Sequence, residues 1–216
     1  MIDTVNDKVV AVLTGDLVRS TSLSHESLLE ARETLRGGAA EIADWGRGDV
    51  YGPDVFRGDS WQLVLTDETL WLRAAVFLRT ALRALDRGAD SRIAIGVGGF
   101  DVLDRRAASR SVGEAFTLSG HALDHMSRGE GFRLAVARSS AAQTYLPTVL
   151  SFCSHVIGEW SASQAKVALE LLRPGAGTQE DVGDALGVSR QFVNKVHRQS
   201  GLSSVLMALE VFEGRS

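Results

Sequence analysis

A short apolar run that ends in a carboxylate opens the chain: VVAVLTGD, residues 9–16. Its first five residues are all apolar and rich in valine, which is typical of a central strand covered on both faces. Asp16 then lies at the carboxyl end of this strand. Small hydroxyl residues follow in the segment 20–22 and are candidate N-caps for a helix, whose free N–H groups attract anions. The stretch predicts a site for a metal and a phosphate, or only a polar turn.

Composition narrows the class of protein. With 216 residues and a net charge of -4, the chain fits a medium domain plus a small one, and any basic surface must be local. The single cysteine, Cys153, excludes a disulfide framework within one chain and metal sites built on several cysteines. No apolar stretch has the length of a transmembrane helix, and the N-terminus lacks a signal-peptide pattern. We therefore expect a cytoplasmic protein that does not bind membranes.

Hydrophobic periodicity predicts an α+β fold. The helix expected over 68–86 has a continuous apolar face, with Arg73, Arg79 and Arg83 on the opposite face. The predicted element order is β-α-β-β-α-β-α-β, typical of a ferredoxin-like mixed sheet with helices packed on one face. We expect strands at 9–13, within 55–65, at 92–100 and at 132–137, a loop at 46–54, and helices at 28–45, 68–86, 112–129 and 139–156, the last broken at Pro147.

Gly158 marks a boundary, and everything from Trp160 onward has the pattern of helices, with a short break at 174–177. The chain therefore divides into an α+β domain, residues 1–157, and an all-α domain, residues 158–216.

A second carboxylate, Asp59, lies in the predicted hairpin turn. If the first strand and the hairpin are neighbours, Asp16 and Asp59 repel each other, and a divalent cation is the usual remedy. The segments GDLVRST (15–21), FRGDSWQLVL (56–65), RIAIGVGGF (92–100) and VGEAFTLSGHALDHM (112–126) resemble, in order and spacing, the class III nucleotidyl cyclases over about residues 8–140. The patterns GD-hydrophobic-V-x-S, GD-x-x-Q and G-x-A-F are similar, more closely still, to the bacterial SatD family, which joins a cyclase-like region to a helical tail.

The resemblance implies a nucleotide site at the end of the first strand. Asp16, Asp59 and the backbone carbonyl of Leu17 match the positions that bind Mg²⁺ or Mn²⁺. The backbone amides of four successive residues match the turn that cradles the phosphates of a nucleoside triphosphate or related nucleotide: Val18, Arg19, Ser20 and Thr21.

The catalytic positions depart from the cyclase pattern. Thr117 and His121 stand where cyclases carry the Asn and Arg that hold the ribose and the transition-state phosphate, and Val55 and Arg110 stand where a Lys and an Asp read the purine. Loss of a guanidinium at a transferring phosphate lowers a rate by orders of magnitude. The resemblance therefore implies metal and nucleotide binding more than cyclisation, and His121 and Arg110 are the candidates for catalysis if the protein is an enzyme.

One helix offers a separate metal candidate. His121, Asp124 and His125 have i, i+3, i+4 spacing, which suits either a metal site or a hydrated helix face.

Residues 178–201, TQEDVGDALGVSRQFVNKVHRQSG, have helix-turn-helix spacing. Gly183 is small where two helices cross, and Gly187 permits the left-handed turn residue. Ser189 caps the second helix, whose outward residues suit phosphates or base edges in a major groove: Arg190, Gln191, Asn194, Lys195 and Arg198. The alternative is a helical hairpin that serves only packing or dimerisation.

Two hypotheses follow. The first is a cytoplasmic DNA-binding transcriptional regulator, active as a homodimer, with a degenerate cyclase-like domain that senses a metal and a nucleotide. The second is an enzyme, a divergent class III-type nucleotidyl cyclase or another nucleotidyl-transfer catalyst. An enzyme requires a group that stabilises charge on the transferring phosphate, whereas a sensor requires only the metal and the backbone amides.

Overall fold

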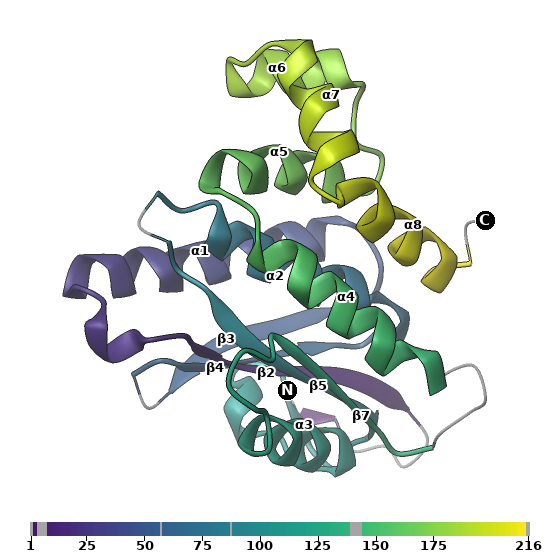
Figure 1. Ribbon diagram of the computed structural model, residues 1–216. Helices are drawn as coiled ribbons and strands as arrows, with labels where there is room; N and C mark the ends of the chain where they lie inside the picture. Colours follow the sequence, from purple (N-terminus) through teal and green to yellow (C-terminus); the bar gives the residue numbers. More distant parts are fainter. Residues whose placement is uncertain (1, 4–7, 57, 87, 139–143, 215–216) are drawn as a thin grey trace.

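A five-stranded mixed sheet forms the centre of the protein (Figure 1). The computed structural model describes residues 2–3, 8–56, 58–86, 88–138 and 144–214. Strand order is β3-β4-β2-β5-β7, with β5 and β7 parallel and the other neighbours antiparallel. The strands are β2 (Val9–Leu17), β3 (Val50–Phe56), β4 (Ser60–Leu65), β5 (Ser91–Gly99) and β7 (Phe132–Val136), and β1 (Ile2–Asp3) pairs with β6 (Leu103–Asp104) as a separate ribbon. The prediction that the opening run is a central strand is confirmed.

Helices follow the strands and then form the whole C-terminal part. Side-chain caps begin several of them: Ser24 caps α1, and Ser161 and Thr178 form capping boxes at α5 and α6. The α-helices are α1 (His25–Asp44), α2 (Trp71–Arg83), α3 (Glu114–Asp124), α4 (Leu146–Gly158), α5 (Ala162–Leu172), α6 (Gln179–Leu186), α7 (Arg190–Gln199) and α8 (Leu202–Phe212), and the short 3-10 turns are η1 (Ser20–Ser22), η2 (Glu68–Leu70) and η3 (Ala108–Arg110). The α+β fold class is confirmed. Among the described helices, none has the length and hydropathy of a bilayer-spanning segment.

Helices cover both faces of the sheet, so the expectation of helices on one face is wrong. Alternate residues of β2 pack in opposite directions: Leu13 joins the core beneath α1 and α2, whereas Val12 packs with Phe116 of α3 on the other side (Figure 1). The all-apolar start of β2 requires this two-sided cover. Gly96 of β5 lets α3 approach, because a Cβ there would lie 2.1 Å from the Ala115 carbonyl oxygen.

Two element boundaries also differ from the expectation. The predicted loop over 46–54 contains most of β3, where an edge strand accommodates Gly52 and Pro53 at a register shift between Tyr51 and Asp54. Pro147 does not break a helix but lies in the first turn of α4, where its missing N–H is harmless. The predicted helical residues 139–143 lie outside the described residues.

Two of the three arginines of α2 are buried and Arg83 is partly buried, contrary to the expected charged outer face. Arg73 and Arg79 are 4% and 6% exposed. Arg73 binds Glu213 at 2.6 Å and the Leu172 carbonyl at 2.8 Å, and Arg83 donates to the carbonyls of Gly158 and Trp160 at 2.7 Å. The C-terminal helices therefore cover α2 and share its hydrophobic core. The division at residue 158 remains a prediction about which parts fold independently.

We expect Arg79→Ala to lower the free energy of unfolding by about 3–5 kcal/mol, because it leaves the Asp90 carboxylate without its bidentate partner in a nearly buried position. Urea denaturation followed by circular dichroism measures the loss. Arg36→Ala is the matched control, since the Arg36–Glu33 pair is exposed on α1 and contributes less than about 1 kcal/mol. Equal effects of the two substitutions would show that the buried pair has no special role.

Candidate functional site

The end of β2 opens into a cavity of about 720 Å³, which also contains the start of β5 and the turn before β7. The predicted metal and phosphate residues all line it: Asp16, Leu17, Val18, Arg19, Ser20, Thr21 and Asp59. Four acidic side chains and four arginines, Asp16, Asp59, Asp90, Glu130, Arg19, Arg79, Arg92 and Arg128, are among the described lining residues. The cavity is therefore lined by both acidic and basic side chains.

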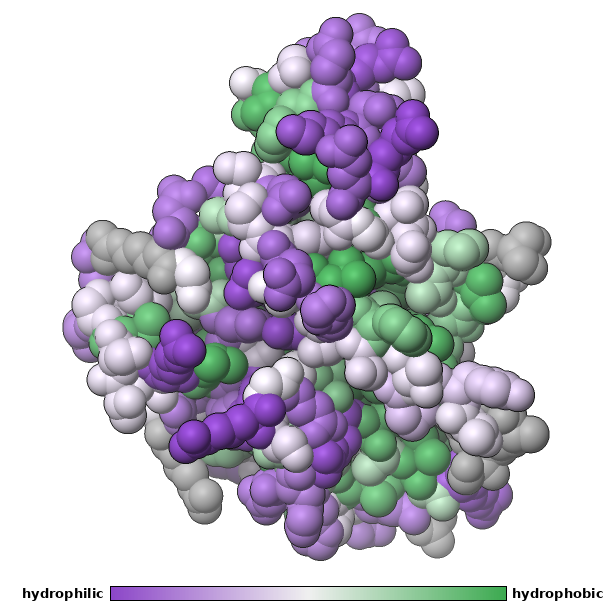
Figure 2. All heavy atoms as spheres, viewed as in Figure 1, coloured by the Kyte–Doolittle hydropathy of each residue, from purple (hydrophilic) through white to green (hydrophobic). Residues whose placement is uncertain are grey.

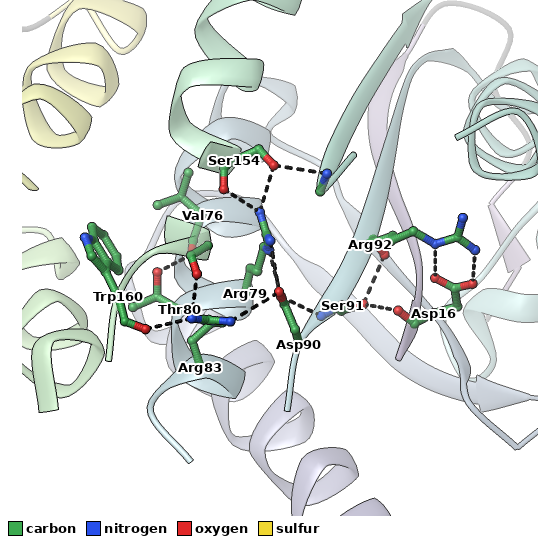
Figure 3. Close-up of polar contacts among 12 residues, drawn as sticks. Asp16, Val76, Arg79, Thr80, Arg83, Asp90, Ser91, Arg92, Ser154 and Trp160 are labelled. Atoms are coloured by element: carbon green, nitrogen blue, oxygen red, sulfur yellow. Dashed lines mark hydrogen bonds and ion pairs between the residues drawn. The ribbon is translucent and has the colours of Figure 1, made fainter. Parts of the chain in front are cut away.

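Arg92 holds the Asp16 carboxylate (Figure 3). The two residues lie directly opposite each other in the antiparallel β2–β5 pair, which places their side chains on the same face. Arg92 Nε donates to one Asp16 oxygen at 3.0 Å, and Nη2 donates to the other at 2.5 Å. The hydrogen bonds to Asp16 raise the pKa of Arg92 against the opposing effect of burial. Both oxygens of this predicted metal ligand are thus engaged by an arginine.

Asp59 lies beside Asp16 at the same end of the sheet, as the hairpin pattern predicted. Its backbone carbonyl accepts the Leu17 N–H at 3.1 Å, and its carboxylate accepts the Ser20 hydroxyl at 2.5 Å. Hard cations such as Mg²⁺ and Mn²⁺ prefer carboxylate and carbonyl oxygens, so this pair and the Leu17 carbonyl have suitable chemistry. Among the described residues there is no group of three His, Cys, Asp or Glu side chains placed for a metal. A cation here therefore has to displace Arg92, and Mg²⁺ or Mn²⁺ remains a prediction.

The predicted phosphate turn has a strained backbone. Arg19 adopts the left-handed conformation, with φ 56° and ψ 34°, at the start of η1. A residue with a Cβ occupies that region at a cost of about 1 kcal/mol or more, and such strain often accompanies binding sites. The Val18 amide donates to the Asp90 carbonyl at 2.8 Å and is occupied, whereas the described structure gives the Ser20 and Thr21 amides no acceptor.

Sequence reasoning missed the residues that hold this site together, Asp90, Ser91 and Arg92 at the start of β5. The Ser91 hydroxyl donates to the Asp16 carbonyl at 2.7 Å and accepts the Trp61 indole N–H at 3.0 Å. The only sequence signal is the run of polar residues immediately before a buried strand. That run becomes informative once β5 is known to pair antiparallel with β2, because its start then faces the end of β2.

The candidate catalytic residues do not line the cavity within one chain. Arg110 lies in η3, which packs against β3 and β4, and His121 is an exposed residue of α3, which packs against β5 and β2. His125 Nδ1 donates a hydrogen bond to the His121 carbonyl at 2.7 Å. Within the described part of the chain, His121, Asp124 and His125 do not form a group of side chains placed for a metal. The catalytic roles of Arg110 and His121 remain predictions.

Two further titratable groups, Cys153 and Glu130, have shifted pKa values. Burial raises the pKa of the Cys153 thiol to about 11, so Cys153 is a core residue rather than a nucleophile. Burial also opposes ionisation of Glu130 at the cavity rim, but hydrogen bonds from Arg133 and the Ser127 amide lower its pKa overall. Glu130 is therefore a paired carboxylate near neutral pH.

The second candidate site is the exposed face of α7. Gly187 ends α6 in the left-handed conformation, with φ 65° and ψ 32°, and Ser189 Oγ caps α7 by accepting the Phe192 N–H at 3.2 Å. Val193 and Val196 face the core. The predicted DNA-binding residues are all exposed: Ser189, Arg190, Gln191, Asn194, Lys195 and Arg198. Figure 2 shows hydrophilic side chains gathered over α6 and α7, at the end of the molecule farthest from the sheet.

The sequence matches no family model and no curated protein. Among solved structures, the chain is similar in fold to the guanylyl cyclase Cya2, with 19% sequence identity, a TM-score of 0.44, and coverage of 62% of this chain and 77% of that chain. This likeness concerns the fold alone and carries no conclusion about activity. Membership of the SatD family remains a prediction.

We expect Gly15→Ala to destabilise the protein by about 1–3 kcal/mol, because its Cβ would lie 2.5 Å from the buried Trp61 ring that supports the cavity. Gly37→Ala is the matched control with the opposite sign. Nothing lies within 4 Å of a Cβ at that exposed position of α1, so alanine stabilises the helix by up to about 1 kcal/mol. Thermal unfolding of both variants measures the difference, and a neutral Gly15→Ala would show that the Trp61 ring shifts freely.

Proposed function

We propose that the protein is a DNA-binding regulator that contacts DNA through α7. One observation carries the proposal. α7 is capped by Ser189 and follows a turn at Gly187, and its exposed face bears Arg190, Lys195 and Arg198 and no acidic residue. Guanidinium and ammonium groups neutralise phosphates, and the amides of Gln191 and Asn194 suit adenine edges in a major groove. The protein as a whole is acidic, so this local charge orients it on DNA.

The proposal includes a homodimer and a ligand. A two-fold symmetric pair would present two copies of α7 to the half-sites of a palindrome. The cavity at the end of β2 is the proposed ligand site, for a nucleoside triphosphate or related nucleotide with Mg²⁺ or Mn²⁺. Its support is the convergence of Asp16, Asp59 and the strained turn at Arg19 on one cavity.

A nucleotidyl-transfer enzyme is the second candidate, and a specific observation favours it. Arg19, Arg92 and Arg128 line the same cavity as the two aspartates, so guanidinium groups are present where a transferring phosphate would need them. They compensate in principle for the Asn and Arg that α3 lacks. The cavity therefore contains side chains suited to phosphoryl transfer, although it lacks the Asn and Arg of cyclases.

The α7 face can be tested with the full chain and a duplex of about 30 base pairs of mixed sequence. We expect Arg190→Ala combined with Lys195→Ala to weaken binding at least tenfold in low salt and to lower the slope of log K against log salt by about 2, since two phosphate contacts are lost. Fluorescence anisotropy measures both quantities.

The control for this test changes the net charge equally but on other surfaces: Arg36→Ala combined with Lys166→Ala, both exposed. If the control weakens DNA binding as much as the α7 variant does, binding reflects overall charge and α7 is not the contact surface.

The enzyme hypothesis is tested by incubating the protein with the four ribonucleoside triphosphates and Mg²⁺ or Mn²⁺, followed by mass analysis for cyclic or oligomeric products. We expect intact triphosphate, because the regulator needs binding alone. A product that forms with the wild-type protein and disappears in Asp59→Ala would instead establish the enzyme, since Asp59 lies in the cavity and its loss removes a predicted metal ligand.

A further inference from the structure

The Asp16–Arg92 pair limits what the cavity can bind. Bidentate pairing engages both Asp16 oxygens, so a cation that arrives alone competes with two charge-assisted hydrogen bonds. Among the described residues, the Asp59 carboxylate accepts one hydrogen bond, from the Ser20 hydroxyl. A lone cation therefore meets a site that is already neutralised by a side chain.

Arg92 is also placed to leave Asp16. Its side chain is 32% exposed, and its other hydrogen bond to a described residue is a long one of 3.3 Å, to the Met126 carbonyl. Arg19 and Arg128 line the same cavity and have no ion pair with any described residue. A polyanion in the cavity would meet these two cations first, and Arg92 would complete a group of three.

We propose that Arg92 exchanges Asp16 for a polyphosphate, so that the cavity binds a divalent cation and a polyphosphate anion cooperatively. The anion draws the guanidinium away, which frees Asp16 for the cation, and the cation at Asp16 in turn frees Arg92 for the anion. Each ligand favours the same rearranged state, and such coupling is reciprocal. The inference rests on the proposed ligand-binding role of the cavity and adds Arg92 as an anion-binding residue.

The test uses Mn²⁺ alone, with electron paramagnetic resonance to measure the free ion, and inorganic tripolyphosphate alone, with calorimetry. In Arg92→Gln, Mn²⁺ binds about tenfold or more tightly than in the wild type, because its competitor is gone, whereas tripolyphosphate binds more weakly. Arg92→Lys keeps one positive charge without the bidentate fork and gives intermediate values. Arg36→Gln, remote on α1, changes neither affinity.

Three results would overturn the inference. An Mn²⁺ affinity that is unchanged or weaker in both Arg92 variants would show that Arg92 does not compete for Asp16. If Arg92→Gln gains Mn²⁺ affinity and Asp59→Ala in the same background keeps that gain, the cation binds outside the cavity. If neither ligand binds the wild type or any variant, the ligand-binding part of the proposed function fails as well, whereas the DNA-binding part is decided by the α7 variants.

Discussion

The ion pair between Arg79 and Asp90 is the interaction on which the rest of the structure depends. Arg79 donates to both oxygens of Asp90 at 2.7 and 2.9 Å, and its remaining nitrogen donates to the Ser154 carbonyl and hydroxyl at 3.1 and 3.0 Å (Figure 3). The Ser154 hydroxyl also accepts the Gly131 N–H at 3.0 Å. One guanidinium thereby joins α2, the start of β5, α4 and the turn before β7. A Cβ at Gly131 would lie 2.0 Å from Arg79, so the turn has no room for a side chain.

Asp90 also connects this network to the candidate ligand site. Its carboxylate binds Arg79 beneath the C-terminal helices, whereas its backbone carbonyl accepts the Val18 N–H in the cavity. A movement of the turn after β2 that shifts the Asp90 carbonyl also shifts the carboxylate, which holds α2 and α4. Polar contacts therefore link the cavity to α2 and α4, and such a link transmits a signal only if Asp90 has two stable arrangements.

Features encoded within a short stretch of sequence were predictable, and features that depend on register were not. The apolar run at 9–13, the hairpin turn at Gly58 and the two helices joined at Gly187 each depend on neighbouring residues. The Asp16–Arg92 pair joins residues 76 positions apart, and the Arg73–Glu213 pair spans 140. A stripe of arginines on a helix has the same periodicity whether it faces water or buried carbonyls, so the pattern at α2 could not show which.

The same reasoning explains why the cavity was only half predicted. Asp16 and Asp59 belong to conspicuous Gly-Asp pairs near the end of β2 and in the turn before β4, whereas Arg92 belongs to a strand whose partner is set by the whole sheet. The resemblance to cyclases implied a site built of two carboxylates and a metal. The structure instead pairs the first carboxylate with an arginine, which makes the charge of the site depend on what enters it.

The position of α7 follows from how the tail is fixed. Arg73 binds Glu213 just after α8 and the last carbonyl of α5, so both helices are tied to α2 at buried points. These ties and the shared apolar core use the inner surfaces of α5 and α8. The pair of helices α6 and α7 is then attached through α5 and α8 while the outer face of α7 stays exposed. Since the protein carries a net charge of -4, the proposed contact with DNA depends on the local positive charge of α7 and not on the charge of the whole protein.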